Sequence, residues 1–211
     1  FGVCWYGVYY GCRAFMPHLI AADQAHIVNT SSVNGFWASL GPTTPHSAYS
    51  SAKFAVKGFS EALITDLRMN APHVGVSVVM PGHIGTSIAI NSGKVLGHPD
   101  ALNMSEEDIK VLREQMMQIG GPESEMVMNL SDDQIREVIH QRGLDFRDKA
   151  PTSAGQAATI ILDGVKAGKW RILVGDDAHR LDQRVRANPE GAYESEFLEA
   201  LAEDGDLPAL I

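Results

Sequence analysis

The chain has 211 residues, of which 45% are hydrophobic and 20% are charged, a composition that excludes disorder along its whole length. Its formal net charge of −9 argues against nucleic acid and anionic membrane surfaces as partners, because these bind basic faces. Since no run of about 18 apolar residues occurs and only two cysteines are present, we expect a cytoplasmic protein with no segment that crosses a membrane.

The first half of the chain alternates between helical and strand patterns. Residues 3–20 are crowded with apolar and aromatic side chains and predict a helix. On this helix Cys4 and Cys12 would lie about 12 Å apart along the axis, which is too far for a disulfide. The elements predicted next are a strand at 26–29, a loop at 31–45, a helix at 46–70 and a buried strand at 74–80.

The second half begins with a longer, more polar and Met-rich region. Two short helices are expected at 105–118 and 131–142. Ser105 with Asp108 resembles an N-terminal cap, and Ser131 with Gln134 matches a capping box. The remaining predicted elements are a helix at 152–167, a strand at 171–175, a helix at 177–187 and an acidic, weakly structured tail at 189–211.

This order of elements predicts an α/β fold with a parallel sheet that is covered on both faces. Only three strands are recognisable, whereas such sheets usually contain five or six. The chain also starts at Phe1, without Met and inside an apolar segment. We therefore expect a fragment of a longer chain, with a sheet that is incomplete at its N-terminus.

One pair of side chains with complementary chemistry lies on the helix predicted at 46–70. Tyr49 and Lys53 are four residues apart, so a helix places the phenol and the ammonium on one face. Such a pair also arises by chance, and the spacing alone does not define a site. The context favours one, because Ser31-Ser32 and residues 81–86 follow the two nearest strands, and open α/β sheets bind ligands at that rim.

Three motifs in this order resemble the classical short-chain dehydrogenase/reductase family. They are Asn29-Thr30-Ser31-Ser32, Tyr49-x-x-x-Lys53 and Pro81-Gly82-His83-Ile84-Gly85-Thr86, and the resemblance covers residues 3–90. It implies a Rossmann-type doubly wound parallel sheet, with residues 1–211 as the C-terminal part of a single oxidoreductase domain. It also implies NAD or NADP as the cofactor, although the glycine-rich turn and the NNAG-like segment of the family are absent from this sequence.

The resemblance assigns roles by position. It implies that Tyr49 is the general acid/base, that Lys53 holds the nicotinamide ribose and lowers the pKa of the tyrosine, and that Ser32 orients the substrate oxygen. Together with Tyr49 and Lys53, the residues expected to contact the cofactor are Asn29, Pro81, Gly82, Ile84 and Thr86.

Elementary electrostatics supports the assigned pairing. A free phenol has a pKa of about 10, which is too high for a base at neutral pH. An ammonium about 5 Å away stabilises the phenolate by roughly 3 kcal/mol at an effective dielectric of about 20. We therefore predict a lowered pKa for Tyr49. One departure from the family weakens the relay, because Cys4 stands where an Asn usually supports a water, and a thiol is a poor substitute.

Three features near the predicted site have two interpretations each. His83 is either a residue of the substrate pocket or an ordinary loop residue. The loop 37–45 either forms one wall of the site or is surface variation. The insertion at 88–150 carries five of the eight methionines, at positions 104, 116, 117, 126 and 128, which either form a lid over an apolar substrate or fill helix interfaces.

We thus predict an enzyme that uses NAD or NADP to interconvert a secondary alcohol and a ketone, which are its small-molecule partners. The alternative is a non-catalytic Rossmann-type scaffold or an inactive truncated member. A homodimer or homotetramer is expected through the helices at 3–20 and 46–70, unless these helices only cover the sheet. No metal site is expected, and the absence of a Gly-x-Ser-x-Gly elbow argues against a serine hydrolase.

Overall fold

A computed structural model describes residues 1–39, 46–119, 124 and 127–203, and the chain divides into two compact units. The first unit contains Phe1–Ile84 and the described residues that follow Ala150, and the second contains the described residues of Gly85–Ala150. Most of the loop at 37–45, Met126 and the end of the acidic tail lie outside the described residues.

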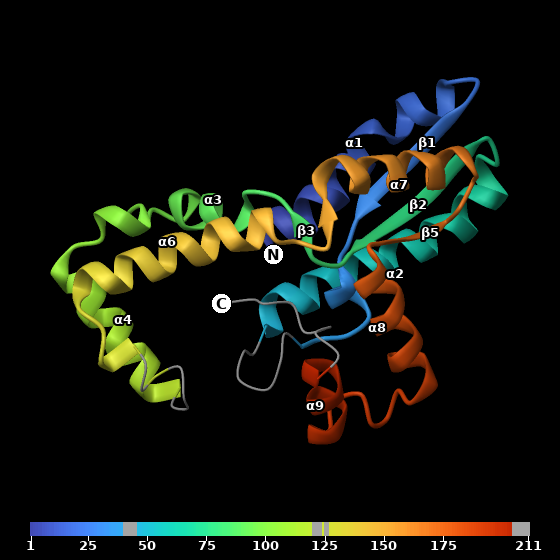
Figure 1. Cartoon of the computed structure of the whole chain (residues 1–211). Helices are drawn as coiled ribbons and strands as arrows, with labels where there is room; N and C mark the ends of the chain where they lie inside the picture. The colour runs from blue at the N-terminus through green and yellow to red at the C-terminus, as the bar shows by residue number, and fades with distance from the viewer. Residues whose placement is uncertain (40–45, 120–123, 125–126, 204–211) are drawn as a thin grey trace. The chain divides into compact units, whose positions relative to one another are not determined.

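The first unit is built from alternating helices and strands (Figure 1). Its N-terminal part contains the π-helix η1 (Gly2–Tyr6), α1 (Gly7–Ala21), β1 (Ala25–Thr30), the 3-10 turn η2 (Val33–Gly35), α2 (Ser47–Asn70) and β2 (Val74–Pro81). Its C-terminal part contains α7 (Ala154–Lys166), β5 (Arg171–Val174), α8 (Asp176–Ala187) and α9 (Ser195–Glu203). Two short strands, β3 (Ile84–Gly85) and β4 (Thr152–Ser153), pair with each other.

The main sheet has the order β1-β2-β5, and both pairings are parallel. Ala25–Thr30 lies opposite Val74–Val79, and Val78–Pro81 lies opposite Arg171–Val174. Parallel pairing brings the carboxyl ends of all three strands to one rim of the sheet. The predicted α/β class with three parallel strands is therefore confirmed, as a Rossmann-like fold with a partial sheet.

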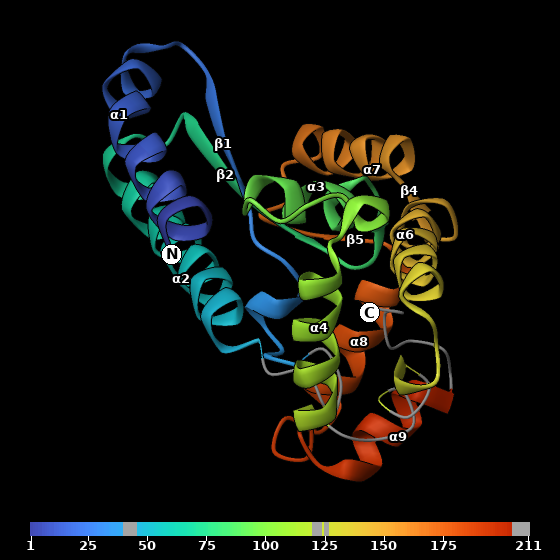
Figure 2. The same cartoon turned by 90° about the vertical axis from the view of Figure 1, so that its left-hand side faces the viewer.

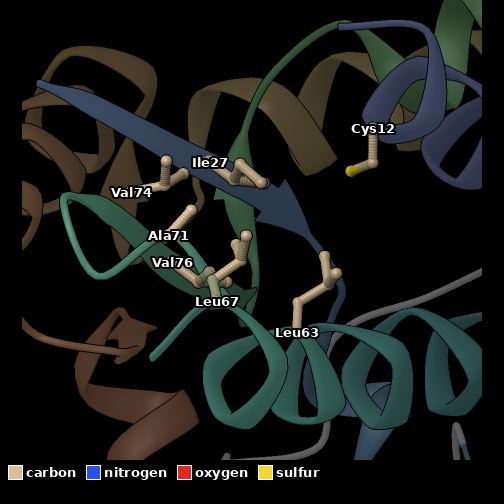
Figure 3. Packing of buried hydrophobic residues seen from close by; sticks show 7 residues of the cluster. All are labelled: Cys12, Ile27, Leu63, Leu67, Ala71, Val74 and Val76. Carbon is tan, nitrogen blue, oxygen red and sulfur yellow. The ribbon is translucent and has the colours of Figure 1, made fainter. Parts of the chain in front are cut away.

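Helices α1 and α2 cover one face of the sheet (Figure 2). Alternate residues of β2 point to this face because the side-chain period of a strand is two. Figure 3 shows how Leu63 and Leu67 of α2 and Cys12 of α1 approach the strands. The buried members of this cluster are Cys12, Ile27, Leu63, Leu67, Ala71, Val74 and Val76.

Helix α7 covers the opposite face. Val79, Ile172 and Val174 pack there against the buried Ala157 of α7. Gly164 of α7 lets the helix approach β5 closely, because a Cβ at this position would lie 2.7 Å from the Cδ1 atom of Ile172. The cap of α7 is a capping box that we did not predict, formed by Ser153 and Gln156.

The acidic tail contains more structure than its composition suggested. Ser195–Glu203 forms α9, and Leu201 on this helix is fully buried. Trp37, only 2% exposed, packs in the same cluster and donates a hydrogen bond from Nε1 to the carbonyl of Ala192 at 2.8 Å. The prediction of a weakly structured tail is therefore wrong for residues 195–203, because Phe197, Leu198 and Leu201 recur at helical spacing within an acidic sequence.

The second unit is helical in its described residues, with two predicted helices confirmed and two elements missed. Its small core contains Ile109, Val127 and Ile135. The predicted capping box of Ser131 and Gln134 is present. The helical elements are α3 (Ile88–Val95), η3 (Ala101–Asn103), α4 (Glu106–Ile119) and α6 (Asp132–Asp148).

Polar groups also tie the segments of the second unit together. Arg113 donates to the backbone carbonyls of Val127 and Leu130 at 2.7 Å each and to Asp132 at 2.9 Å. Arg136 donates to the carbonyl of Met104 at 2.7 Å. Across the ranges that the structure describes, the helices are too short or too polar for any of them to span a bilayer.

Candidate active site

The predicted site lies at the carboxyl end of β1, where the chain turns into η2. Ser32 is the N-cap of η2, and its buried Oγ accepts a hydrogen bond from the N–H of Asn34 at 3.1 Å. Ser31 donates its hydroxyl to the carbonyl of Lys53 at 2.8 Å, which fixes the turn against α2. A Cβ at Gly35 would lie 3.0 Å from the same carbonyl, so a glycine permits this close approach.

Helix α2 presents Tyr49 and Lys53 to this turn. The same stripe of the helix continues with Val56, Leu63 and Leu67, which are buried in the core and anchor α2. The spacing of four residues places the two polar side chains on one face. The Lys53 ammonium lies 5.5 Å from the centroid of the Tyr49 ring.

The structure brings Ser32, Tyr49 and Lys53 together. The Ser32 side chain hydrogen-bonds to the Tyr49 phenol closely enough to affect its pKa. Lys53 donates from Nζ to the carbonyl of Thr30 at 3.0 Å, so the ammonium is tied to the end of β1. The three groups come from two elements that share the rim of the sheet.

The pKa of Tyr49 differs in direction from the one expected from the sequence. Burial raises the pKa of Tyr49 above its usual value, the hydrogen bond of Ser32 opposes this rise, and the charge of Cys4 adds to it. Burial likewise lowers the pKa of Lys53. In the chain by itself the prediction of a lowered tyrosine pKa is therefore wrong, because desolvation of the phenolate outweighs the hydrogen bond of Ser32.

Cys4 lies near this pair. Its charge affects the pKa of both Tyr49 and Lys53, so the thiol of η1 is within electrostatic range of the site. Both cysteines are free thiols. Cys4 thus belongs to the same cluster of groups as Tyr49 and Lys53.

Asn29 is committed to the interior of the first unit. Its side-chain oxygen accepts from the Cys12 thiol at 3.4 Å, and its Nδ2 donates to the Ser60 hydroxyl at 3.0 Å. Only 6% of the residue is exposed. These contacts join β1 to α1 and α2. Because both polar atoms of the Asn29 side chain are used in them, only the backbone of Asn29 could contact a cofactor.

The third motif, Pro81–Thr86, forms the turn after β2. The N–H of Gly82 donates to the carbonyl of Val174 at 3.0 Å, which continues the pairing with β5 past Pro81. Ile84 packs against the apolar cluster below α7, while Thr86 belongs to the second unit. The turn therefore lies at the same rim of the sheet as Ser32, on the neighbouring strand.

Two residues with polar groups at this rim were not singled out from the sequence. The ring of His46 lies 5.1 Å from that of Tyr49, and its buried Nδ1 has no partner in the ranges that the structure describes. Asp177 of α8 accepts a hydrogen bond from the N–H of His83. Its position just after β5 could have predicted a place near the site, because β5 ends at the same rim of the sheet.

Within residues 1–39, 46–119, 124 and 127–203, no three His, Cys, Asp or Glu side chains are placed to hold a metal ion.

Comparisons with known proteins find similar sequences and similar folds. Residues 1–95 match the family described as short chain dehydrogenase. SadH of Mycobacterium tuberculosis is 32% identical over 184 residues, which cover 87% of this chain and 51% of SadH. The 3-ketodihydrosphingosine reductase of Bacteroides thetaiotaomicron is 37% identical over 87 residues, or 41% of this chain and 30% of that protein.

Among solved structures, a short chain dehydrogenase/reductase from Burkholderia phymatum in complex with NAD matches with a TM-score of 0.58 and 27% identity. The match covers 90% of this chain and 56% of that one. The chain thus spans about half the length of SadH and of this structure. By these matches and by its own motifs, the chain is similar to classical short-chain dehydrogenases/reductases, and the match to the family itself lies within residues 1–95.

Proposed function

We propose that the chain forms the catalytic part of an oxidoreductase that interconverts a secondary alcohol and a ketone with NAD or NADP. The observation that carries the proposal is the grouping of Ser32, Tyr49 and Lys53 at the carboxyl rim of the sheet. A phenol can exchange a proton with a carbonyl oxygen, and a hydroxyl can orient that oxygen by a hydrogen bond. An ammonium can donate hydrogen bonds to the hydroxyls of a ribose.

The described residues fit a nicotinamide cofactor. An ammonium has three N–H donors, and Lys53 uses one of them for the carbonyl of Thr30, which leaves capacity for ribose hydroxyls. The solved relative from Burkholderia phymatum binds NAD, which supports the same class of cofactor here. When bound, the cofactor supplies the hydride chemistry.

The chain's own residues donate and accept the proton of the proposed reaction. Because burial raises the pKa of Tyr49, the phenol is protonated at neutral pH. A protonated phenol can donate its proton to a ketone oxygen, so the chain by itself has the protonation state that reduction of a ketone requires. Ser32 is placed to orient that oxygen, and the positive charge of Lys53 stabilises the phenolate that remains.

The second unit is the proposed lid over an apolar substrate. The four methionines that the structure describes in this unit divide into two groups, because Met104 and Met116 pack around the core of Ile109 while Met117 and Met128 are 59% and 43% exposed. The first pair fills helix interfaces. The second pair offers adaptable apolar surface and is the part to which we assign substrate contact.

The raised pKa of Tyr49 also favours a second candidate, a non-catalytic family member. Its proton relay would be impaired because Cys4 replaces the usual Asn, while the fold would remain as a scaffold. In that case the protein binds a partner or a cofactor without turnover.

Turnover assays separate the two candidates. The whole protein, as its gene encodes it, is mixed with NADH or NADPH and a series of ketones of increasing apolar bulk, and the nicotinamide absorbance is followed. We expect reduction of at least one bulky ketone. Tight cofactor binding without turnover on any ketone or on the matching alcohols supports the scaffold instead.

A further inference from the structure

In the turn after β2, the N–H of His83 has no hydrogen-bond acceptor on a neighbouring strand of the sheet that the structure describes. Gly82 is the last residue paired with β5, through its N–H and the carbonyl of Val174. The N–H of His83 instead donates to Oδ2 of Asp177 at 2.6 Å. A side chain at the start of α8 therefore replaces the sheet as the partner of this turn.

Two glycines make room for this carboxylate. A Cβ at Gly82 would lie 2.2 Å from Oδ2 of Asp177, and a Cβ at Gly175 would lie 2.3 Å from Oδ1. Gly175 also has φ of +101°, a conformation that side-chain-bearing residues rarely adopt. The ends of β2 and β5 are thus both shaped around Asp177.

The carboxylate is held without a full set of hydrogen bonds. Its Oδ1 is buried and has no hydrogen-bond partner in the part of the chain that the structure describes. Leaving a buried acceptor unsatisfied costs free energy, so packing alone does not favour an Asp here. The position in the first turn of α8 compensates in part, because a helix N-terminus stabilises negative charge.

We propose that Asp177 is a positioning residue for cofactor binding. It fixes the Pro81–His83 turn through the N–H of His83 and touches neither the cofactor nor the reacting atoms. The inference rests on the proposed function, in which this turn contacts the nicotinamide. Without the Asp177 carboxylate, the N–H of His83 loses its acceptor and the Pro81–His83 turn becomes more mobile. Cofactor binding then has to order the turn, which weakens the affinity for the cofactor.

Three variants separate this role from its alternatives. Asp177→Ala removes the acceptor, and Asp177→Asn keeps an oxygen that can accept from His83 while removing the charge. Asp176→Ala is the matched control, because Asp176 is an exposed carboxylate in the same helical turn. It tests whether the charge at the start of α8 is sufficient.

The first measurement is the Kd of NADH and NADPH for the whole protein, by fluorescence titration, together with kcat at saturating cofactor. Asp177→Ala should raise the Kd about tenfold or more, because a hydrogen bond to a charged group is lost, while kcat falls much less. Asp177→Asn and Asp176→Ala should stay near the wild-type Kd. An unchanged Kd in Asp177→Ala, or an equal rise in the Asp176→Ala control or in Asp177→Asn, overturns the proposal.

The second measurement needs no activity. Hydrogen exchange at the amide of His83 should accelerate in Asp177→Ala and keep its wild-type rate in Asp177→Asn and Asp176→Ala. If Asp177→Ala exchanges at the wild-type rate, Asp177 does not hold the turn. A wild-type protein that binds neither cofactor contradicts the proposed function and the cofactor role of Asp177, while this exchange rate still decides whether the carboxylate holds the turn.

Discussion

The two units of this chain are stabilised in different ways. The first unit is built on a parallel sheet whose strand residues Val78, Val79 and Val174 are completely buried, between helices on two faces. The second has helices around a core of three buried residues, and the arginines Arg113 and Arg136 tie its segments through backbone carbonyls. Its helical surface also leaves apolar side chains such as Val95 and Leu96 exposed.

This difference indicates which unit can hold catalytic side chains in fixed positions. A side chain on a helix that is packed over its whole length keeps its position, whereas long polar helices with exposed methionines adapt. Tyr49 and Lys53 lie on α2, which is anchored along one stripe, and Ser32 caps the turn that packs against it. The first unit therefore suits a fixed catalytic group, and the second suits a variable substrate.

The largest effect is expected from the catalytic group itself. Tyr49→Phe removes the proton donor but keeps the ring, so kcat should fall by about 10²–10⁴ in the whole protein while the melting temperature barely changes. Tyr10→Phe is the control, because this tyrosine of α1 is 59% exposed. A kcat for Tyr49→Phe that matches the control would remove the tyrosine from the mechanism.

The ion pairs of the two units should differ in strength. Asp182 is 8% exposed and bonds to both Arg171 and Arg186, so Asp182→Ala should lower the free energy of unfolding by about 3–5 kcal/mol. Asp133→Ala breaks the Arg136 pair in the second unit, where the carboxylate is 95% exposed, and should leave stability unchanged. Urea denaturation measures both, and equal losses would contradict the comparison.

Asp182 also predicts a pH dependence. Burial raises the pKa of Asp182, but the hydrogen bonds and charges of Arg171 and Arg186 outweigh it and hold the pKa below the usual 3.8. A carboxyl whose pKa is lower when folded contributes stability above its usual value, and loses it as the pH falls through the folded value. The acid limb of the stability curve should therefore flatten in Asp182→Ala and stay unchanged in Asp133→Ala.

The cores of the two units can be broken separately. Leu67→Ala and Ile135→Ala each remove a buried side chain and should cost about 2–5 kcal/mol in the unit concerned. In hydrogen exchange, Leu67→Ala should accelerate the amides of β1 and β2, and Ile135→Ala those of α4 and α6. If Ile135→Ala accelerates β2 as strongly as α6, the units do not open independently.

The smallest effect concerns the proposed lid. Met117→Ser removes exposed apolar surface from the second unit and should raise the KM for bulky ketones a few-fold, without a change in KM for small ones. Met116→Ser is the comparison variant, because Met116 packs against the core and should act on stability first. Equal KM effects on large and small ketones would make the second unit an ordinary insertion.

Much of the fold could be predicted because local signals were sufficient. The runs at 74–81 and 171–174 are rich in β-branched residues, and the helix at 47–70 has apolar residues at helical spacing, so these elements were found to within a residue or two. The grouping of Tyr49 with Lys53 follows from a spacing of four, which is also local. Helix α9 was missed because its burial depends on Trp37, far away in the sequence.

Two features of the site depended on tertiary structure. The direction of the Tyr49 pKa is decided by burial, which no spacing of charges reveals. The contact between Asp177 and His83 joins residues 94 positions apart, at the ends of two strands whose pairing had to be known first. Sequence motifs therefore predicted the candidate site, while its electrostatics and its support follow from tertiary packing.

The central claim is that Ser32, Tyr49 and Lys53 act as one unit on one proton transfer. A double-mutant cycle tests it most directly, with kcat/KM measured for Ser32→Ala, Tyr49→Phe and the double variant in the whole protein. Groups that serve the same step lose their effect together, so the double variant should be no slower than Tyr49→Phe by more than about threefold. Losses that multiply fully would show two independent functions and contradict the account.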